Sequence, residues 1–419
     1  SQPRADGRNR TDNLTLTKGL LYLLSYIGFL SLFYHKLVKL PEYSIFVRII
    51  IKTISLVFMS VKKKKVIVGM SGGVDSSMSL LILKNKGYEP LGVTLLLPIW
   101  KNSQNLLREN ICCTKESVNL AKSICQKFDV PYFVLNKQKE FKKIVVDYFK
   151  REIKENRTPN PCVICNRYFK FKHLIDWATK HKIFYVATGH YAKIKYNKKT
   201  KKYELFRAKD KKKDQSYNLS FLTQNQLKRL IFPLGNLFKK EVYKLAEKEG
   251  FSIFYQKPQS QDFCFVSNKS LKEFIKSYLK PKPGLIIDKS GKILGRHNGL
   301  NFYTLGQRKG INLSNGPYYV CGFDFKKNLL IVTKNRNALY KKEIIISKVN
   351  FISGRKIRKP TTVSVKTRSQ QKPLPAILKP FSNNHYQIIF KKRVFAPTPG
   401  QIAVFYQKDK CLGGGIIRK

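Results

Sequence analysis

Three cysteines stand in settings where a thiol could do chemistry. Cys162 and Cys165 form a Cys-x-x-Cys pair after Pro159 and Pro161, and these prolines hold the approaching chain extended. Cys165 begins a stretch with helical spacing of apolar residues that ends near Lys180. Because a helix N-terminus stabilises a thiolate, the reactive form of cysteine, this pattern predicts a nucleophilic Cys165.

Cys264 lies between Phe263 and Phe265, a setting that by itself is typical of a core residue. If the fold brings Cys264 and Cys165 into one cleft, one thiol could carry sulfur and the other could resolve it. Two alternatives stay open for the Cys-x-x-Cys pair. It could be buried and inert, or it could bind zinc, although no second Cys-x-x-Cys supplies further ligands.

A glycine-rich loop is the second element that could do chemistry. It reads Ser71-Gly72-Gly73-Val74-Asp75-Ser76, and it follows the β-branched run Val66–Val68 and precedes a helical pattern. Glycines let the backbone approach a ligand, and loop N–H groups together with a helix N-terminus form an anion cradle. No Gly-Lys-Ser/Thr follows, which excludes the common P-loop. The alternative is an ordinary strand-to-helix turn that happens to be rich in glycine.

The chain around these residues alternates strands and helices. Further strands are predicted at 91–97, 132–135 and 183–187, and helices at 114–128 and 140–155. This order predicts an α/β domain with a doubly wound parallel sheet. Ligands bind beyond the carboxyl ends of the strands in such sheets, and both the glycine loop and the Gly189-His190 pair fall there.

The pattern changes after about residue 267. One more helix is predicted at 271–279, Pro281–Gly284 breaks the chain, and short strands with turns follow. We expect a catalytic domain at 62–266, a small central domain at 267–342 and a β-rich C-terminal domain at 343–419. Evenly spaced short strands favour a small barrel or sandwich for that last domain.

The composition favours a polyanionic partner. The 419 residues include 82 Lys and Arg against 25 Asp and Glu, a formal net charge of +57, and nucleic acid is the obvious match. Compositional drift of an AT-rich genome is the alternative explanation for this excess. Eight cysteines are too few for a disulfide scaffold at this length, which indicates reduced thiols.

Residues 1–61 differ from the rest and are interpreted as a leader, a targeting segment or a gene-model extension. The apolar runs Gly19–Phe33 and Ile45–Met59 are each shorter than the roughly 20 residues that a membrane-spanning helix needs, so we expect no stable membrane association. The segment is basic and poor in acidic residues, as a presequence would be. We favour an extension over residues 1–58, because Met59 is a natural start just before the first strand.

The loop Ser71–Ser76 resembles the PP-loop of ATP pyrophosphatases, which split ATP into AMP and pyrophosphate. Five more segments accompany it in order, and the set as a whole resembles the tRNA-specific 2-thiouridylase family: Thr158–Asn166, Thr188–Tyr191, Lys213–Tyr217, Gln261–Phe265 and Pro399–Tyr406. The resemblance runs from about Lys62 to the C-terminus. It implies a PP-loop catalytic domain, a central domain and a C-terminal β-barrel, and an enzyme that replaces O2 of the wobble uridine of tRNA with sulfur.

The resemblance also implies a mechanism. ATP, with Mg²⁺, would adenylate the uridine oxygen, because a carbonyl oxygen leaves poorly and AMP leaves well. A persulfide on Cys264 would deliver the sulfur, and Cys165 would release it by forming a disulfide with Cys264. The ATP-binding positions that match the family are Gly69, Met70, Ser71, Gly72, Gly73, Val74, Asp75, Ser76, Leu95 and Gly189.

Contacts to tRNA are implied in the same way. Asn160, Pro161 and Cys162 match the segment that meets the target base, which must leave its stack to be modified. The other matching positions are His190, Lys213, Asp214, Gln215, Arg368, Ser369 and Gln401. For each polar or basic one, a solvated surface residue is the alternative. The implied partners are tRNAs of the Lys, Glu and Gln type and a sulfur donor, such as a cysteine desulfurase or a relay protein. The implied compartment is the bacterial cytoplasm, or an organelle if residues 1–58 are a presequence.

One position departs from the family pattern. Many members carry Asp, with a general acid/base role, where this chain has Cys162. Cys162, Cys165 and Cys264 could instead hold a [4Fe–4S] cluster on three ligands, with the adjacent Cys112-Cys113 as a structural or relay pair. The persulfide and the cluster mechanisms both stay open.

Two competing functions are weaker. A PP-loop ligase for a small molecule, such as an NAD or GMP synthetase, fits poorly with the basic charge and the β-rich C-terminal domain. A non-catalytic tRNA-binding module fits poorly with the intact loop Ser71–Ser76.

Overall fold

The computed structural model describes residues 63–98, 114–251, 254, 263–266, 270–382 and 384–418. The predicted leader 1–61, the pair Cys112-Cys113, and Gln261 and Asp262 lie outside the described residues. Residues Lys65–Lys419 form one compact unit of the chain, and the following description concerns that unit.

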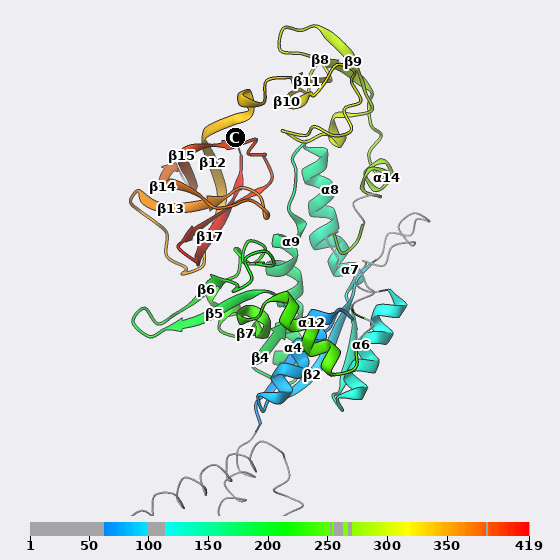
Figure 1. The fold of residues 1–419 in the computed structure, drawn as a ribbon, viewed down its shortest axis with the longest axis vertical. Helices are drawn as coiled ribbons and strands as arrows, with labels where there is room; N and C mark the ends of the chain where they lie inside the picture. Colours follow the sequence, from blue (N-terminus) through cyan, green and yellow to red (C-terminus); the bar gives the residue numbers. More distant parts are fainter. Residues whose placement is uncertain are drawn as a thin grey trace, which may run out of the picture. The chain divides into compact units, whose positions relative to one another are not determined.

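A five-stranded sheet forms the core of the first domain (Figure 1). Every neighbouring pair of its strands is parallel. In spatial order the strands are β3 (Tyr132–Asn136), β2 (Glu89–Leu96), β1 (Lys65–Gly69), β4 (Tyr185–Thr188) and β7 (Leu230–Ile231). The predicted parallel sheet is confirmed.

Both faces of this sheet are covered, as alternation along β1 requires. Val66 and Val68 pack with helices on one face, and Ile67 packs into a separate cluster on the other. The first face is covered by α4 (Val74–Asn85), α6 (Lys115–Lys127) and α12 (Lys239–Lys248), and the second by α10 (Phe171–Lys180). The predicted doubly wound architecture is therefore confirmed.

Two helical stretches near the carboxyl ends of the strands each contain a π-helical turn. The first consists of α7 (Gln138–Phe141), the π turn Lys142–Val146 and α8 (Asp147–Lys154). The second consists of α9 (Pro161–Ile164), the π turn Cys165–Lys170 and α10. π turns are rare in regular helices, and those that occur are often found at functional sites.

The central domain has its own small sheet and core. Its strands lie in the order β10 (Tyr319–Asp324), β11 (Leu329–Thr333), β8 (Gly284–Ile287) and β9 (Ile293–His297). Ile286, Val320 and Leu330 are fully buried there. The remaining short helices of the described chain are α11 (Gln224–Leu227), α14 (Leu271–Lys276) and the 3₁₀ turns Pro233–Asn236, Leu300–Phe302 and Arg336–Leu339.

The C-terminal strands close into a barrel. They pair in the order β12 (Tyr340–Phe351), β15 (His385–Phe395), β14 (Leu374–Ser382), β13 (Thr361–Lys366), β16 (Ile402–Gln407) and β17 (Lys410–Ile417). Strand β17 pairs back to β12, which closes the barrel and leaves no open edge between them. The predicted C-terminal barrel is confirmed.

A hairpin of the first domain joins the barrel sheet, and the sequence analysis did not predict it. It consists of β5 (Ala192–Asn197) and β6 (Lys202–Arg207), and β6 pairs with β17 at Lys410 and Cys411. Leu205 and Tyr217 share a buried cluster with residues of the barrel. The barrel is thus packed onto the first domain through a common core.

None of the helices in the part of the chain that the structure describes has both the length and the apolar character needed to cross a membrane.

Candidate active site

The glycine loop leaves β1 at the carboxyl end of the sheet. Met70 N–H donates to the Val93 carbonyl at 2.8 Å, which ties the loop to β2. Gly72 has a φ of +72°, and a Cβ there would lie 2.2 Å from the Ser117 carbonyl oxygen of α6. Only glycine fits this position, because the backbone is left-handed and another backbone lies directly against it.

Helix α4 begins with an open N-terminus. Gly73 is its N-cap, and among the described residues no side chain caps it. The Ser76 hydroxyl accepts from Ser71 N–H at 3.2 Å and donates to the Gly73 carbonyl at 2.9 Å, which fixes the loop from within. The first-turn N–H groups of a helix without a cap, together with the helix dipole, favour an anion. The arrangement suits the phosphates of a nucleotide.

Asp75, in the first turn of α4, is held by two groups that the sequence did not link to it. Tyr191 O–H donates to Asp75 Oδ1 at 2.7 Å, and Lys239 Nζ lies 2.6 Å from the same oxygen. Lys239 is buried, and its ammonium lies 4.9 Å from the centre of the Tyr243 ring. Burial and the nearby Asp75 carboxylate raise the pKa of Tyr191, so its hydroxyl stays protonated and donates.

Gly189 contacts the same turn. A Cβ at Gly189 would lie 2.6 Å from the backbone carbon of Asp75 and 2.8 Å from Ser76 N. The end of β4 therefore packs directly on the start of α4. Lys239 gave no signal in the sequence, because it is one lysine among many and lies 164 residues from Asp75.

Cys165 and Cys264 belong to one aromatic cluster, although about a hundred residues of sequence separate them. Cys165 is buried in this cluster, and Cys264 packs against it. The Phe263 and Phe265 rings, on either side of Cys264, are stacked with centres 6.0 Å apart. Ring contacts of Phe141 with both Phe265 (5.9 Å) and Phe169 (5.0 Å) connect this turn to the π turn of Cys165.

The cluster also reaches the carboxyl end of the sheet. Leu95 and Leu96, at the end of β2, pack against it. Strand β2 is hydrogen-bonded to β1, the strand that leads into the glycine loop. The two thiols thus lie at the same edge of the sheet as that loop.

The prediction of a stabilised thiolate at Cys165 is wrong. Helical structure begins at Pro161, so Cys165 lies one turn inside a continuous helical stretch rather than at its start. Burial raises the pKa of the Cys165 thiol to about 12, and the nearby Lys170 ammonium opposes this only in part. Burial likewise raises the pKa of Cys162 to about 12, and Cys264 adds to the rise. Both thiols are protonated at neutral pH.

A [4Fe–4S] cluster does not fit this conformation. Cys162, Cys165 and Cys264 influence one another electrostatically, and all three are free thiols. In the described part of the chain, however, no three His, Cys, Asp or Glu side chains form a group that could hold a metal ion. We derive no chemical step through a cluster.

Two residues predicted to contact tRNA, His190 and Asp214, are buried. A hydrogen bond of 2.7 Å joins Nδ1 of the His190 ring to Thr188 Oγ1, and the ring packs against Phe171 and Phe232. Burial holds the pKa of His190 well below its ordinary value. The Asp214 side chain is 0 % exposed. Its carboxylate accepts from backbone and side-chain donors of Ala208, Ser216 and Arg207. Both side chains thus make internal contacts in this structure, and their contact with tRNA stays a prediction.

Lys213 and Gln215 flank Asp214 and are half-buried. Gln215 exchanges hydrogen bonds with Tyr191: its side-chain oxygen accepts from Tyr191 N–H at 2.9 Å, and its own N–H donates to the Tyr191 carbonyl. The segment Lys213–Gln215 is therefore attached to the residue that holds Asp75.

The barrel packs against the chain just before Asn160–Cys162, the predicted target-base segment. Asn160 caps α9 by accepting from Val163 N–H at 3.2 Å. Gln401 Nε2 donates to the Pro159 carbonyl at 3.3 Å, and Thr158 N–H donates to the Pro399 carbonyl at 2.9 Å. Gly400 approaches so closely that a Cβ there would lie 2.9 Å from Thr158.

The Arg368 guanidinium donates to Thr398 Oγ1 at 3.4 Å, next to Pro399, and Ser369 beside it is half-buried. The Arg368 guanidinium donates to the carbonyls of Leu305 (3.2 Å) and Ala396 (3.1 Å). These bonds link the barrel to the central domain. Arg368 is exposed enough to contact a ligand as well.

Known proteins similar to this chain share almost their whole length with it. It is 41 % identical over 361 residues to the tRNA-specific 2-thiouridylase MnmA of Acetivibrio thermocellus, covering 85 % of this chain and 99 % of that one. The MnmA proteins of Clostridium beijerinckii (41 %, 99 % covered) and Carboxydothermus hydrogenoformans (40 %, 98 % covered) each match 85 % of this chain. This chain belongs to the tRNA-specific 2-thiouridylase family.

Three domain families match this 2-thiouridylase-family chain in order. They are described as the tRNA methyl transferase HUP domain at residues 64–268, the tRNA methyl transferase PRC-barrel domain at 272–334 and the aminomethyltransferase beta-barrel domain at 341–417. Among solved structures, the U34-tRNA thiolase NcsA of Methanococcus maripaludis, determined with its [4Fe-4S] cluster, is 18 % identical. The match covers 52 % of this chain and 65 % of the NcsA chain, with a TM-score of 0.28. That likeness is too low to bear on the chemistry here.

Proposed function

We propose that this chain is a tRNA-specific 2-thiouridylase, which uses ATP to activate O2 of the wobble uridine and replaces that oxygen with sulfur. The observation that carries the proposal is the shared aromatic cluster of Cys165 and Cys264, which packs on the end of β2 beside the strand of the glycine loop. Nucleotide and sulfur chemistry can meet at one edge of the sheet.

The glycine loop, Gly69–Ser76, is the proposed phosphate site. Its support is the left-handed Gly72, the open N-terminus of α4 and the buried ammonium of Lys239 next to Asp75. Mg²⁺ bound with ATP would neutralise phosphate charge, and Asp75 is the carboxylate placed to assist, since Mg²⁺ binds through few carboxylates and the substrate phosphates. Leu95 is proposed to border the adenosine, and Gly189 to set the approach of β4 to the loop.

Sulfur transfer is proposed to use both thiols of the cluster. The terminal sulfur of a Cys264 persulfide attacks C2 of the adenylated uridine, and the C2–O bond breaks to release AMP. The Cys165 thiolate then attacks the Cys264 sulfur atom. The S–S bond to the uridine breaks, its electron pair stays on the 2-thiouridine, and a Cys165–Cys264 disulfide forms. A thiol reductant restores the two cysteines.

The raised pKa of Cys165 means that its proton must leave during the reaction. Burial favours the neutral thiol and so protects the pair from oxidation before substrate binds. The Lys170 ammonium lowers the pKa of both Cys162 and Cys165, so it is the positive charge available to stabilise a thiolate there.

Partners and details follow the family. We propose tRNAs of the Lys, Glu and Gln type as substrates, and a cysteine desulfurase or a relay protein as the sulfur donor. The compartment is proposed to be the bacterial cytoplasm, or an organelle matrix or stroma if residues 1–58 are a presequence.

The test is thiolation by the purified protein with ATP, a persulfide source and unmodified tRNA. Wild type is expected to form 2-thiouridine, measured by nucleoside mass spectrometry, and Cys264→Ser is expected to bind ATP but form none. Cys321→Ser is the matched control, because Cys321 is a half-buried free thiol in the central domain and should be dispensable. Retained thiolation by Cys264→Ser would contradict the assigned role. AMP formation with a small acid and no tRNA would instead indicate a ligase.

A further inference from the structure

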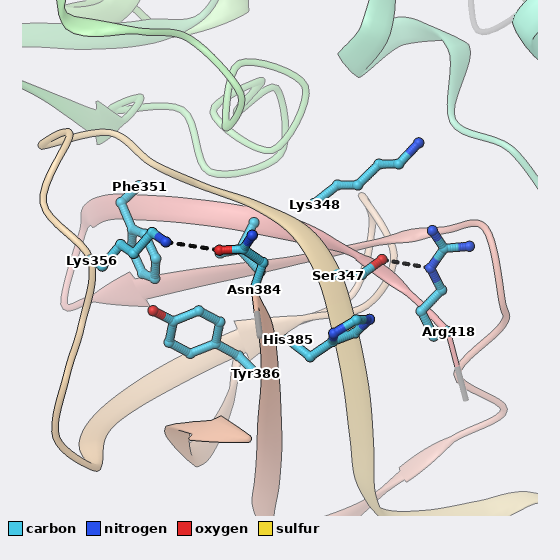
Figure 2. Close-up of a pocket in the computed structure, with 9 residues that line it drawn as sticks. Ser347, Lys348, Phe351, Lys356, Asn384, His385, Tyr386 and Arg418 are labelled. Carbon is cyan, nitrogen blue, oxygen red and sulfur yellow. Dashed lines mark hydrogen bonds between the residues drawn. The ribbon is translucent and has the colours of Figure 1, made fainter. Parts of the chain in front are cut away.

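The barrel carries a pocket, lined in part by basic side chains, that the reaction does not use (Figure 2). Its volume is about 420 Å³, and it lies where the end of β12, the start of β15 and the residue after β17 meet. Its walls consist of Ser347, Lys348, Val349, Phe351, Lys356, Asn384, His385, Tyr386 and Arg418. Two lysines, an arginine and a histidine stand in this set, and no acidic residue does.

Two of these cations, Lys348 and Arg418, lie near the ends of neighbouring paired strands. The pairing of β12 with β17 shifts register between Ser347 and Asn350, and Lys348 within this bulge has a φ of +47°. Bulges re-aim side chains at barrel rims. Lys348 is exposed and has no hydrogen-bond or ion-pair partner among the described residues.

Arg418 is oriented by a single anchor. Its Nε donates to Ser347 Oγ at 2.5 Å, and its two terminal nitrogens have no partner within the described chain. Figure 2 shows Arg418 and His385 on the same side of the pocket. On the other side, Lys356 Nζ donates to Asn384 Oδ1 at 2.8 Å, next to the Tyr386 ring. A guanidinium with a free fork matches a phosphate, which it can bind through two parallel hydrogen bonds.

The pocket is connected to the proposed target-base segment. Arg418 follows Ile417, and Ile417 N–H donates to the Gln401 carbonyl at 2.8 Å. The Gln401 side chain in turn donates to the Pro159 carbonyl, beside Asn160–Cys162. Hydrogen bonds therefore link the strand that ends next to Arg418 to the proposed target-base segment.

We propose that this pocket binds the phosphodiester backbone of the tRNA, with Arg418 and Lys348 as the principal contacts. The inference rests on the proposed function, because that function supplies tRNA as the partner. The net charge of +57 and the absence of acidic residues from the pocket wall make a polyanion the complementary occupant. A contact of this kind sets the register of the tRNA and does not read its sequence.

The experiment measures tRNA affinity against salt concentration for wild type and for Lys348→Asn/Arg418→Gln. Asn tolerates the left-handed backbone at 348, and Gln retains a donor for Ser347. The control is Lys391→Gln/Lys392→Gln, which removes the same charge from exposed residues of β15, roughly 20 Å along the strand from His385. Folding of each variant is checked by circular dichroism, and Lys348→Asn alone serves if the double variant unfolds.

The expected result is a shallower salt dependence for the pocket variant. Each lost phosphate contact lowers the slope of log affinity against log salt by about 0.7–0.9, or roughly 1.4–1.8 for two contacts. The control is expected to keep the slope of wild type. A pocket variant with an unchanged slope would overturn the inference, and so would equal losses in pocket and control variants. Wild-type protein that neither binds nor thiolates tRNA would instead overturn the proposed function.

Discussion

The contrast between two glycine-to-alanine changes tests how the nucleotide site is built. Gly189→Ala places a methyl group 2.6 Å from the Asp75 backbone, whereas ordinary contact begins at 3.4 Å. The end of β4 and the start of α4 would have to separate by about 0.8 Å, the difference of these distances. Gly73→Ala is different, because the nearest described atom to its methyl group would be Ser71 Oγ at 3.5 Å.

The two changes should therefore affect stability and binding differently. Overpacking costs about 1–3 kcal/mol, and the contact at Gly189 is with backbone that cannot rotate away, so we expect the upper part of this range. Gly73→Ala should cost only about 0.5–1 kcal/mol, because alanine is a poorer N-cap than glycine. Its methyl group, however, would project into the loop that is proposed to hold the phosphates, beside Ser71 Oγ. Loss of one hydrogen bond to a charged phosphate, about 1.5–3 kcal/mol, should weaken ATP binding roughly 10- to 100-fold.

Urea denaturation and isothermal titration with ATP measure both effects on the same preparations. The expected pattern is a large stability loss for Gly189→Ala, and a near-normal stability with weak ATP binding for Gly73→Ala. If Gly73→Ala binds ATP like wild type, phosphates do not lie against this loop. If Gly189→Ala is as stable as wild type, the close approach of β4 to α4 is not a constraint on the fold.

Three further predictions concern the same edge of the sheet. Lys239→Met removes the ion-pair partner of Asp75 and should weaken ATP binding at least tenfold in the same titration. Lys244 is an exposed lysine of α12, and the control Lys244→Met should leave ATP binding unchanged. The pKa of the Cys165 thiol is raised from 9.0 to about 12, so iodoacetamide should alkylate it roughly a thousandfold more slowly than an ordinary thiol at pH 7.5. That rate should rise about tenfold per pH unit, and peptide mass spectrometry can follow it; rapid alkylation at pH 7.5 would refute the burial argument. Protein purified without oxygen should thiolate tRNA without bound iron, as iron and sulfide assays would show; a cluster needed for activity would refute the thiol mechanism.

Local sequence was sufficient for the elements that carry the glycine loop. The β-branched run at Val66–Val68 and the serines after Gly73 specify a strand, a turn and a helix within twelve residues, and the structure has these elements. Short-range signals of this kind depend on backbone preferences and on periodicity, which neighbouring residues determine. The parallel sheet followed from the alternation of strands and helices along the chain. For the C-terminal domain the local pattern favoured a barrel or a sandwich, and only the family resemblance implied the barrel that the structure has.

Long-range pairing was not predictable. The hairpin β5–β6 joins the barrel because β6 pairs with β17, and the sequence of the hairpin does not indicate which strand it pairs with. The ion pair between Lys239 and Asp75 likewise depends on α12 packing beside α4. One lysine among 82 Lys and Arg residues gives no pattern by which to select it.

The sequence by itself determined which residue types are present and where the chain turns: the glycines of the loop, the cysteines and their spacing. Tertiary structure alone decided their chemical state. Burial in the aromatic cluster keeps Cys165 a neutral thiol, and enclosure makes His190 a neutral core residue. The physical reason is that the pKa of a side chain depends on the solvent and the charges around it, and distant parts of the chain supply that surrounding.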